Sequence, residues 1–379
     1  MIEKNQPLPD ALILIHDATD LGGAELHLLE ILKVCRKRGI PAYLITSKAG
    51  TLFEQFKKLT KAQCIVPIPY PRKPKTWLRM PVFLKTCKRF IKNINAKKTC
   101  IFVGDFYPLW AALKLKPLAP IISLWQGEYR FDSNECPKKW IRYGANRADL
   151  LLANEAICKH ASATGLLKRP LLPLNPRISK TRFNPHKHDR EALREKFLWS
   201  QKTAVCVGRY GEGKGQPWLV DQFLNDAELY KNWRLVLIGT ISEADKCSLE
   251  KALSKRKGGH KVSIWCERHD IPEIYAAADV ALFPGIVQES YGLAVLEAVT
   301  MHIPIIAMAS GALPYLLENT LELIPMGSRK TLIKKWKEDP FSNVCAEGSS
   351  IAVASDLEKQ ISQAFESVSH ETSNILSDD

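Results

Sequence analysis

The stretch FPGIVQESYGLAVLEAVTMHIPIIA, residues 283–307, decides how the whole chain is interpreted. Just before it, the apolar run at residues 280–283 ends at Pro284-Gly285, which predicts a short buried parallel strand followed by a loop. Further on, Leu293, Leu296 and Val299 recur at helical spacing, and Pro304 marks the latest end of that helix. The stretch therefore predicts one strand–loop–helix unit of an α/β protein.

Two glutamates flank the start of this predicted helix. Glu289 precedes it and Glu297 lies eight residues later, about 12 Å along a helix axis. A helix N-terminus suits a phosphate, and Gly292 lets a ligand approach the backbone closely. Two carboxylates at this separation could bind opposite ends of an elongated, hydroxyl-rich ligand. The spacing alone equally allows a helix-capping residue and a solvated surface glutamate.

The segment resembles the Glu-x7-Glu signature of the retaining glycosyltransferases of family 4. Further family marks follow the right order over roughly residues 11 to 320: Gly22-Gly23-Ala24-Glu25, Val207-Gly208-Arg209 with Lys214-Gly215, Leu237-Ile238-Gly239 and Ala278-Asp279-Val280. The resemblance implies an α/β fold of GT-B type, with two Rossmann-like parallel-sheet domains facing each other across a cleft that binds a nucleotide-sugar.

Arg209 and Lys214 lie in a glycine-rich turn after the first predicted strand of the second half. Arginine binds phosphate oxygens with two parallel hydrogen bonds and lysine acts as a point charge, so the pair could neutralise a diphosphate. The alternative is a loop with solvated cations. The resemblance places both residues on the nucleotide diphosphate and makes them, with Glu289, the catalytic candidates.

The resemblance implies further donor-binding residues. Glu297 would accept hydrogen bonds from the ribose hydroxyls, and Glu289 would lie beside the donor sugar. Gly22 and Gly23 would close the cleft from the first domain, although a plain strand–helix turn explains them too. The donor-binding residues implied in this way are Gly22, Gly23, Arg209, Lys214, Glu289, Ser290, Tyr291, Gly292, Leu293 and Glu297.

One position departs from the family pattern near the sugar. Many members have a histidine after the fifth strand of the first domain, whereas this chain has Gln126. A glutamine can hydrogen-bond a sugar or acceptor hydroxyl but cannot transfer a proton. Gln126 is therefore a candidate sugar or acceptor contact without an acid–base role.

The chain contains no Asp-x-Asp pair, which metal-dependent transferases commonly use to hold the diphosphate. We therefore expect no metal site and no cofactor besides the nucleoside-diphosphate-sugar itself. Arg209, Lys214 and the helix terminus would stabilise the departing diphosphate while the sugar gains oxocarbenium character. Retention of the anomeric configuration is implied by the resemblance and not by these residues.

With 379 residues the chain is long enough for two domains. Strands alternate with helices twice over, and a Pro-, Arg- and Lys-rich connection separates the two series. The first series of expected strands covers 11–16, 42–46, 64–68, 100–103, 121–124 and 150–153, and the second covers 204–207, 235–238, 262–265, 280–283 and 305–307. We expect a basic acceptor-binding domain at 1–170, a nucleotide-sugar-binding domain at 171–355, and a closing helix with a polar tail at 356–379. No run of apolar residues is long enough for a membrane span. The ten cysteines form no Cys-x-x-Cys pair, which indicates a reducing cytoplasm without disulfides.

Positive charge is concentrated in the first half. Residues 1–180 have a net formal charge of +18, and residues 33–98 contain 18 Lys and Arg but a single acid, Glu54. A helix drawn over 77–94 has one apolar face and an opposite basic face. This helix either packs on the sheet with its basic face in water, or lies on an anionic membrane or a phosphorylated lipid acceptor. No nucleic-acid-binding motif is present, so nucleic acid is not expected as a partner.

These observations predict a hexosyltransferase that moves a sugar from a nucleoside-diphosphate-sugar to an acceptor hydroxyl. The acceptor would be a lipopolysaccharide, another lipid-linked glycan or a cell-envelope polysaccharide. The location would be the cytoplasm, or the inner face of the cytoplasmic membrane as a peripheral protein. The alternatives are a catalytically silent nucleotide-sugar-binding protein and another GT-B enzyme, such as a sugar-nucleotide epimerase.

Overall fold

The structure is a computed structural model of the chain, and it describes residues 9–20, 22–70, 73–126, 143–155, 157–159, 167–169, 171–266, 268–287, 289, 291–317, 321–344 and 357–375. The chain divides into two compact units. The first contains residues 1–177 and 354–379, and the second contains residues 178–353.

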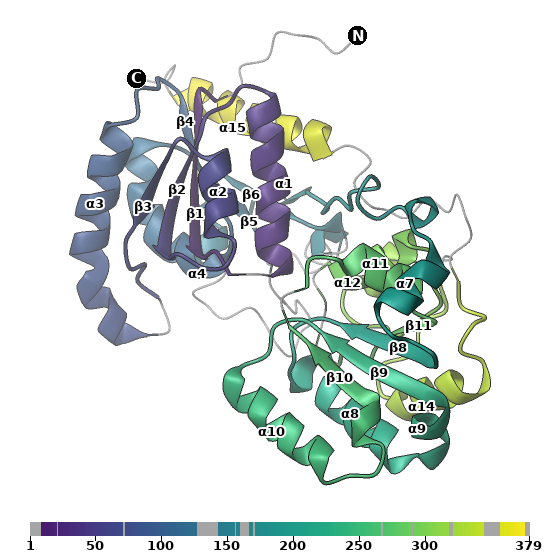
Figure 1. The fold of residues 1–379 in the computed structure, drawn as a ribbon. Coiled ribbons are helices and arrows are strands. Elements are labelled where there is room, and N and C mark those ends of the chain that lie inside the picture. Colours follow the sequence, from purple (N-terminus) through teal and green to yellow (C-terminus); the bar gives the residue numbers. More distant parts are fainter. Residues whose placement is uncertain are drawn as a thin grey trace. The chain divides into compact units, whose positions relative to one another are not determined.

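The first unit is built on a seven-stranded, all-parallel sheet in the order β3-β2-β1-β4-β5-β6-β7 (Figure 1). The apolar strand β1 is central, with Ile15 paired to Ile45 on one side and to Val103 on the other. Such a sheet must be covered on both faces, because its central strands β1, β4, β5 and β6 are mostly apolar and buried. Its strands are β1 (Ala11–Ala18), β2 (Ala42–Lys48), β3 (Ala62–Ile65), β4 (Thr99–Val103), β5 (Ile121–Leu124), β6 (Leu150–Ala153) and β7 (Leu171–Pro173).

Two separate apolar clusters cover the two faces of this sheet. One face packs against α1 (Gly23–Lys37), α2 (Phe53–Leu59) and α15 (Leu357–Ile375). The other packs against α3 (Met80–Lys92), α4 (Phe106–Ala112) and the 3-10 helix Leu113–Leu118. The C-terminal helix α15 thus belongs to the first unit, where it lies beside α1, and Glu358 forms ion pairs with Lys37 and Arg38 (Figure 1).

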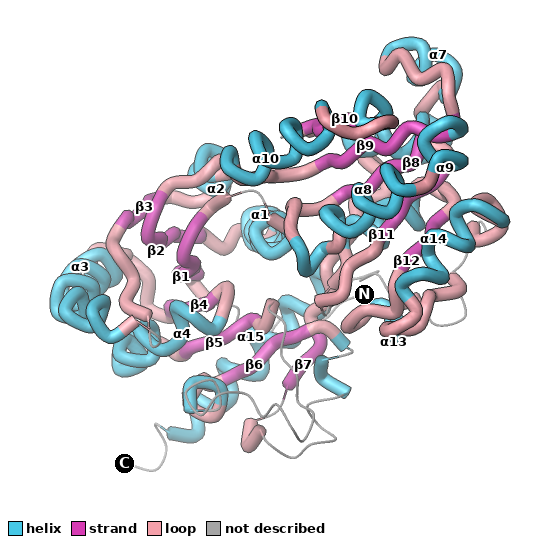
Figure 2. Tube along the Cα trace, turned by 90° about the horizontal axis from the view of Figure 1, so that it is seen from below, coloured by secondary structure: helices cyan, strands magenta, loops and turns pink. Residues whose placement is uncertain are grey.

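The second unit has a five-stranded parallel sheet in the order β10-β9-β8-β11-β12, whose strands carry these labels among the magenta strands in Figure 2. Its strands are β8 (Lys202–Val207), β9 (Trp233–Ile238), β10 (Val262–Trp265), β11 (Val280–Phe283) and β12 (Ile305–Ala307). Its helices are α7 (Arg190–Lys196), α8 (Gln216–Asn225), α9 (Ala227–Asn232), α10 (Glu243–Ser254), α11 (Ile271–Ala277), α12 (Leu293–Thr300), α13 (Leu313–Leu316) and α14 (Arg329–Glu338). Short 3-10 helices cover Pro74–Arg79, Pro185–Lys187, Glu212–Lys214 and Gly259–Lys261.

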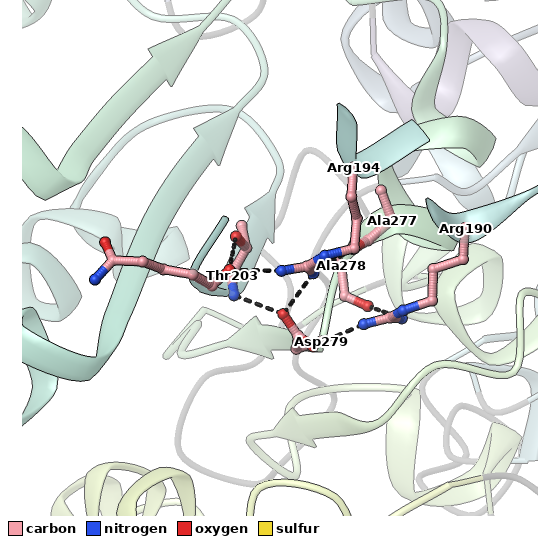
Figure 3. Close-up of polar contacts among 7 residues, drawn as sticks. Arg190, Arg194, Thr203, Ala277, Ala278 and Asp279 are labelled. Atoms are coloured by element: carbon pink, nitrogen blue, oxygen red, sulfur yellow. Dashed lines mark hydrogen bonds and ion pairs between the residues drawn. The ribbon is translucent and has the colours of Figure 1, made fainter. Parts of the chain in front are cut away.

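A partly buried ion network ties the start of the second unit to its sheet (Figure 3). The Asp279 carboxylate, just before β11, accepts hydrogen bonds from Arg190 at 2.7 Å, from Arg194 at 2.9 Å and from the Thr203 backbone N–H at 2.7 Å. Both arginines come from α7 and also donate to the carbonyls of Ala278 and Ala277 at the end of α11. The family mark Ala278-Asp279-Val280 therefore acts as a structural clamp between α7, β8 and β11.

Some predicted boundaries were wrong. The third strand is β3 at 62–65 and not 64–68, because the chain leaves the sheet before the prolines at 67 and 69. The segment 171–173, assigned to the second domain, is β7, and its pairing with β6 places it in the first unit. The boundary therefore follows Arg177 and does not fall at 170/171. A strand this short, ending in Pro173, has too little pattern to be recognised from sequence.

The basic helix of the first unit is shorter than the predicted 77–94. It begins at Met80, follows a 3-10 helix and ends at Lys92. Phe83, Cys87 and Ile91 are buried against the sheet, while Lys85, Lys88, Arg89 and Lys92 are exposed. The apolar face of this helix therefore packs on the sheet, as one of the two alternatives predicted, and its basic face is exposed and available to contact an anionic surface.

The cysteines within the described ranges are all free thiols, and most are buried. Burial raises the pKa of Cys206, next to the glycine-rich loop, to about 12. Within the described residues, no helix combines the length and apolar content needed to cross a membrane.

Candidate functional site

A glycine-rich loop leaves the carboxyl end of β8 and carries two of the predicted site residues. Gly208 has φ 151° and Gly215 has φ 81°, values that favour glycine. A side chain at Gly215 would lie 2.4 Å from the Pro284 carbonyl oxygen, and one at Gly239 would lie 2.2 Å from the Gly208 carbonyl oxygen. The loop is therefore packed backbone to backbone against the ends of β9 and β11. This close packing explains the glycines independently of any ligand.

Two backbone hydrogen bonds bring the two halves of the predicted donor site together. The Gly213 carbonyl accepts from the N–H groups of Ile286 and Val287, at 2.9 and 3.1 Å. The buried Gln216 side chain donates to the carbonyls of Gly208 and Arg209, which holds the other end of the loop. The loop after β8 and the loop after β11 thus form one rigid edge of the sheet.

Lys214 and Glu289 meet at this edge. The Lys214 ammonium forms an ion pair and hydrogen bond with the Glu289 carboxylate, although the residues are 75 apart in sequence. Both side chains are partly exposed, at 33% and 21%. By contrast, the exposed Arg209 guanidinium makes no side-chain hydrogen bond or ion pair to another described residue. A diphosphate approaching the loop would therefore meet one free cation and one that is shared with a carboxylate.

The backbone of Glu289 is held by the loop after β12. Its N–H donates to the Ser310 hydroxyl at 3.2 Å, and its carbonyl accepts from the Ala312 N–H at 2.8 Å. The loop that contains Ser310 and Ala312 thus positions the first glutamate. Ser310 was not predicted, since nothing in its neighbourhood marks it as a site residue.

Helix α12 begins at Leu293 with Gly292 as its N-cap, in the left-handed conformation at φ 60°. The Leu313 side chain lies 2.3 Å from where a Gly292 side chain would be, so the helix start and the loop after β12 are in close contact. Neither the Gly292 nor the Leu293 N–H donates to another described residue. These amides and the helix dipole form an anion-binding position at the helix start. Tyr291 is buried beside it, and Ser290 lies outside the described residues.

Glu297 lies near the middle of α12 and is half-buried, and its carboxylate makes no hydrogen bond or ion pair to another described residue. Burial raises the pKa of its carboxyl to about 7, an effect partly offset by the charge of Arg182. Behind it, the buried Tyr275 hydroxyl donates to the Ala294 carbonyl at 2.8 Å rather than to Glu297. Burial, followed by the nearby Glu297 charge, raises the pKa of Tyr275 well above its usual value, which keeps it a neutral donor. The carboxylate therefore remains available as an acceptor.

In the first unit, Gly22 caps α1 and Gly23 is its first residue. A side chain at Gly22 would lie 2.4 Å from the Glu25 carboxylate. Glu25 in turn hydrogen-bonds Nε2 of the buried His16 at 3.0 Å, at the end of β1. The absence of a side chain at Gly22 therefore leaves room for the Glu25 carboxylate. This geometry is compatible with a plain strand–helix turn and also with a ligand contact.

Gln126 follows β5 in the first unit and is buried. Its amide Nε2 donates to the Gly104 carbonyl at 2.8 Å, while its Oε1 has no hydrogen-bond partner among the described residues. A buried amide oxygen without a partner costs free energy unless a ligand supplies a donor. A ligand hydroxyl at Gln126 could supply that donor, and an amide cannot transfer a proton itself.

Arg329 is a cation near the donor loop that sequence reasoning missed. From the first turn of α14 it donates to the Gly215 carbonyl at 3.3 Å and stacks 4.1 Å from the Trp218 ring centroid. Burial lowers the pKa of this arginine. Arg329 was not predicted because it is far from Gly215 along the chain and no motif links the two.

No group of three or more potential metal-ligating side chains occurs in the part of the chain that the structure describes. Metal independence stays a prediction.

Comparisons with known proteins agree with this architecture. Residues 201–338 match the family model described as "Glycosyl transferases group 1". The lipopolysaccharide core biosynthesis mannosyltransferase LpsB of Rhizobium meliloti (strain 1021) is 25% identical over 196 residues, which are 51% of this chain and 52% of that protein. The chain thus spans about half the length of the curated relative that it matches.

Solved structures resemble the chain over nearly its whole length. HepE from Anabaena in complex with UDP-glucose aligns with a TM-score of 0.66 and 17% identity, covering 97% of this chain and 99% of that one. WaaG, described as a glycosyltransferase involved in lipopolysaccharide biosynthesis, aligns with a TM-score of 0.63 and 18% identity, covering 86% and 90%. At these identities the likeness establishes the fold. The chain therefore has the two-sheet architecture of the GT-B glycosyltransferases, and its residues 201–338 match the family model of the glycosyl transferases group 1.

Proposed function

We propose that the protein is a glycosyltransferase that uses a nucleoside-diphosphate-sugar and acts in the synthesis of lipopolysaccharide core or a similar lipid-linked glycan. One observation supports it most: around α12 a single edge of the second sheet carries the Lys214–Glu289 pair, two helix-start amides and the half-buried Glu297. Neither the amides nor the Glu297 carboxylate has a hydrogen-bond partner among the described residues. A half-buried carboxylate without a partner is unfavourable in the free protein, so it indicates a position that a ligand satisfies.

The arrangement suits the chemistry of a departing diphosphate. Arg209, Lys214 and the α12 amides would stabilise the negative charge that builds on the leaving phosphate. Glu297 would accept hydrogen bonds from the ribose hydroxyls, and Glu289 would orient the sugar while positioning Lys214. Activity without a metal is part of this proposal, since the cations and the amides can stabilise the charge without a metal ion. Retention of configuration is also part of it and rests on the family resemblance.

The acceptor class draws support from the relatives. LpsB is named as a lipopolysaccharide core mannosyltransferase and WaaG as a glycosyltransferase of lipopolysaccharide biosynthesis. HepE was solved with UDP-glucose and with UDP, which supports a nucleotide-sugar as the donor. The exposed basic face of α3 supports a location at an anionic membrane surface, where such acceptors are found.

The experiment is a panel of UDP-, GDP- and ADP-sugars, followed by release of the nucleoside diphosphate with and without a chelator. We expect slow hydrolysis of one donor that persists with the chelator and is lost in Glu297→Ala. Loss of activity with the chelator would contradict metal independence, and conversion of the sugar without its release would indicate an epimerase instead.

Gln126 favours one second candidate, a catalytically silent protein that binds nucleotide-sugars. Its amide cannot take part in proton transfer, and its Nε2 is already bonded to the Gly104 carbonyl. Tight binding of a nucleotide-sugar without turnover, even with lipopolysaccharide precursors added, would establish this candidate and exclude the enzyme.

A further inference from the structure

A cavity of about 230 Å³ opens in the first unit, outside the residues discussed so far. Its walls include Trp110, Lys114, Lys116, Tyr143, Arg147 and Arg169. Lys116 precedes β5, Arg147 precedes β6 and Arg169 precedes β7, so the cavity lies toward the amino edge of the sheet. Gly22 and Gln126 lie at the opposite, carboxyl edge, which makes the cavity separate from the candidate donor site.

The cavity is strongly cationic. Of its basic residues, Lys116 is neutralised by Asp149 at 2.6 Å. Lys114 and Arg147 are exposed and form no ion pair with another described residue. The Arg147 guanidinium lies 3.7 Å from the Tyr143 ring centroid, and its Nη1 donates to the Tyr143 carbonyl at 3.4 Å. These two contacts orient the guanidinium, and its remaining N–H groups can still donate to an anion. The cavity thus offers preoriented donors and uncompensated positive charge.

An apolar surface borders the cavity. Trp110 stacks on Trp77 with ring centroids 5.4 Å apart, so the cavity wall continues into the segment that precedes α3. Next to Trp77, which is 48% exposed, Leu78 is 84% exposed and Val82 is 59% exposed. Large apolar side chains with this exposure, gathered beside basic residues, are typical of surfaces that insert shallowly into a membrane.

We propose that this cavity is a binding site for the phosphate-bearing headgroup of an anionic phospholipid, with Trp77, Leu78 and Val82 contacting the acyl region. The cations and the stacked arginine match a phosphodiester, and the apolar residues beside them match a lipid rather than a free phosphate. The inference rests on the membrane location proposed above, and it does not depend on sugar transfer.

The test is vesicle flotation of the full chain with phosphatidylcholine vesicles that contain or lack phosphatidylglycerol. The double variant Lys114→Gln/Arg147→Gln removes the two uncompensated cations and leaves α3 unchanged. Since each basic residue near an anionic surface strengthens binding severalfold, we expect the double variant to bind about 30-fold more weakly. The matched control, Lys57→Gln/Lys58→Gln, removes the same charge from α2 on the other face of the sheet and should change binding by less than about twofold.

The outcomes distinguish the headgroup site from the membrane location. If both double variants weaken binding equally, the attraction is general and the headgroup site is wrong, while the membrane location stands. No flotation of the wild type would overturn both. Binding of soluble glycerol phosphate that Lys114→Gln/Arg147→Gln abolishes, without flotation, would make the cavity a site for a soluble phosphate and overturn the lipid assignment. Unchanged thermal melting of both variants serves as the folding control.

Discussion

At the scale of single residues, the candidate site contains two carboxylates in opposite situations. Glu289 is paired with Lys214 and held through its backbone by Ser310 and Ala312. Glu297 lacks a partner among the described residues, and burial raises its pKa to about 7. A paired carboxylate keeps its geometry without a ligand, whereas an unpaired one contributes unfavourably until a ligand arrives.

Replacing Glu297 by glutamine should therefore stabilise the free protein while weakening donor binding. Its folded pKa of about 7 exceeds the ordinary 4.5, so the folded state binds this proton more tightly and loses stability as the pH rises from about 4.5 to about 7. We expect Glu297→Gln to be about 2 kcal/mol more stable than the wild type near pH 8 and equal to it near pH 4. Urea unfolding at the two pH values measures this difference.

The same titration predicts a pH dependence of nucleotide affinity. Because the ionised carboxylate accepts hydrogen bonds from ribose, the affinity of the wild type for its nucleoside diphosphate should fall as the pH drops below about 7. Glu297→Gln should bind more weakly with a flat profile. Calorimetric titration across this range checks the prediction, and an unchanged pH profile in the variant would assign the titration to another group.

Lys214 is expected to act on the leaving group and not only as a partner of Glu289. Lys214→Gln should lower kcat by about 10²-fold, as loss of one charge-stabilising donor does elsewhere. Lys231→Gln, an exposed lysine on α9, is the control and should leave kcat unchanged. If Lys214→Gln changed KM alone, Lys214 would contribute to ground-state binding and not to the transition state.

At the scale of elements, the site depends on how loops at the carboxyl edge are packed. The start of α12 needs a left-handed residue at Gly292, and Leu313 fills the space where a side chain would go. In the loop 208–215, the Pro284 carbonyl likewise occupies the space where a side chain at Gly215 would lie. These contacts hold the backbone amides that would bind phosphate in place, so the proposed function depends on the tight packing of these loops.

Gly292→Ala should lower both stability and donor affinity. The residue would be strained at φ 60° and would also collide with Leu313, which together cost about 2 kcal/mol. Gly211→Ala is the matched control, because Gly211 has an extended backbone and open space around it. Thermal melting and nucleotide titration of both variants make the comparison. An equal loss in both would mean that flexibility, and not the left-handed start of α12, matters.

The Asp279 clamp is predicted to contribute more to stability than the surface ion pairs. Asp279→Ala leaves the mostly buried Arg194 without its carboxylate, which should cost about 3 kcal/mol. Asp221→Ala removes a carboxylate that pairs with Arg256 at the surface and should cost less than about 1 kcal/mol. Calorimetric melting of the full chain compares them, and a similar loss in both variants would contradict the clamp.

At the scale of the whole molecule, each unit buries its own core, and the first unit is completed by the far end of the chain. Helix α15 places Leu357, Ile361 and Phe365 in the cluster that covers one face of the first sheet. The first unit therefore lacks part of its core until the last helix has been made. Charge is divided in the same way, because the excess of Lys and Arg lies in the first half.

Phe365→Ala should therefore destabilise the first unit although it lies near the C-terminus. The side chain is 2% exposed, and truncating a buried phenylalanine costs about 3 to 4 kcal/mol. Gln363→Ala, exposed on the same helix, should change stability by less than about 0.5 kcal/mol. Hydrogen exchange of the β1 and β6 amides reports on the first unit. Unchanged exchange in Phe365→Ala would show that α15 is not needed there.

The sequence by itself determined the two parallel sheets, because continuous apolar strands alternating with amphipathic helices permit few other folds. It also predicted the strands at 121–124, 150–153, 262–265, 280–283 and 305–307 with their observed bounds. Only the tertiary structure decided that Lys214 contacts Glu289, that Ser310 holds the Glu289 backbone and that Arg329 lies behind Gly215. The apolar periodicity of strands and helices is a local property that can be recognised in the sequence. These contacts instead join segments far apart in the chain, which meet only when the loops at one sheet edge pack together.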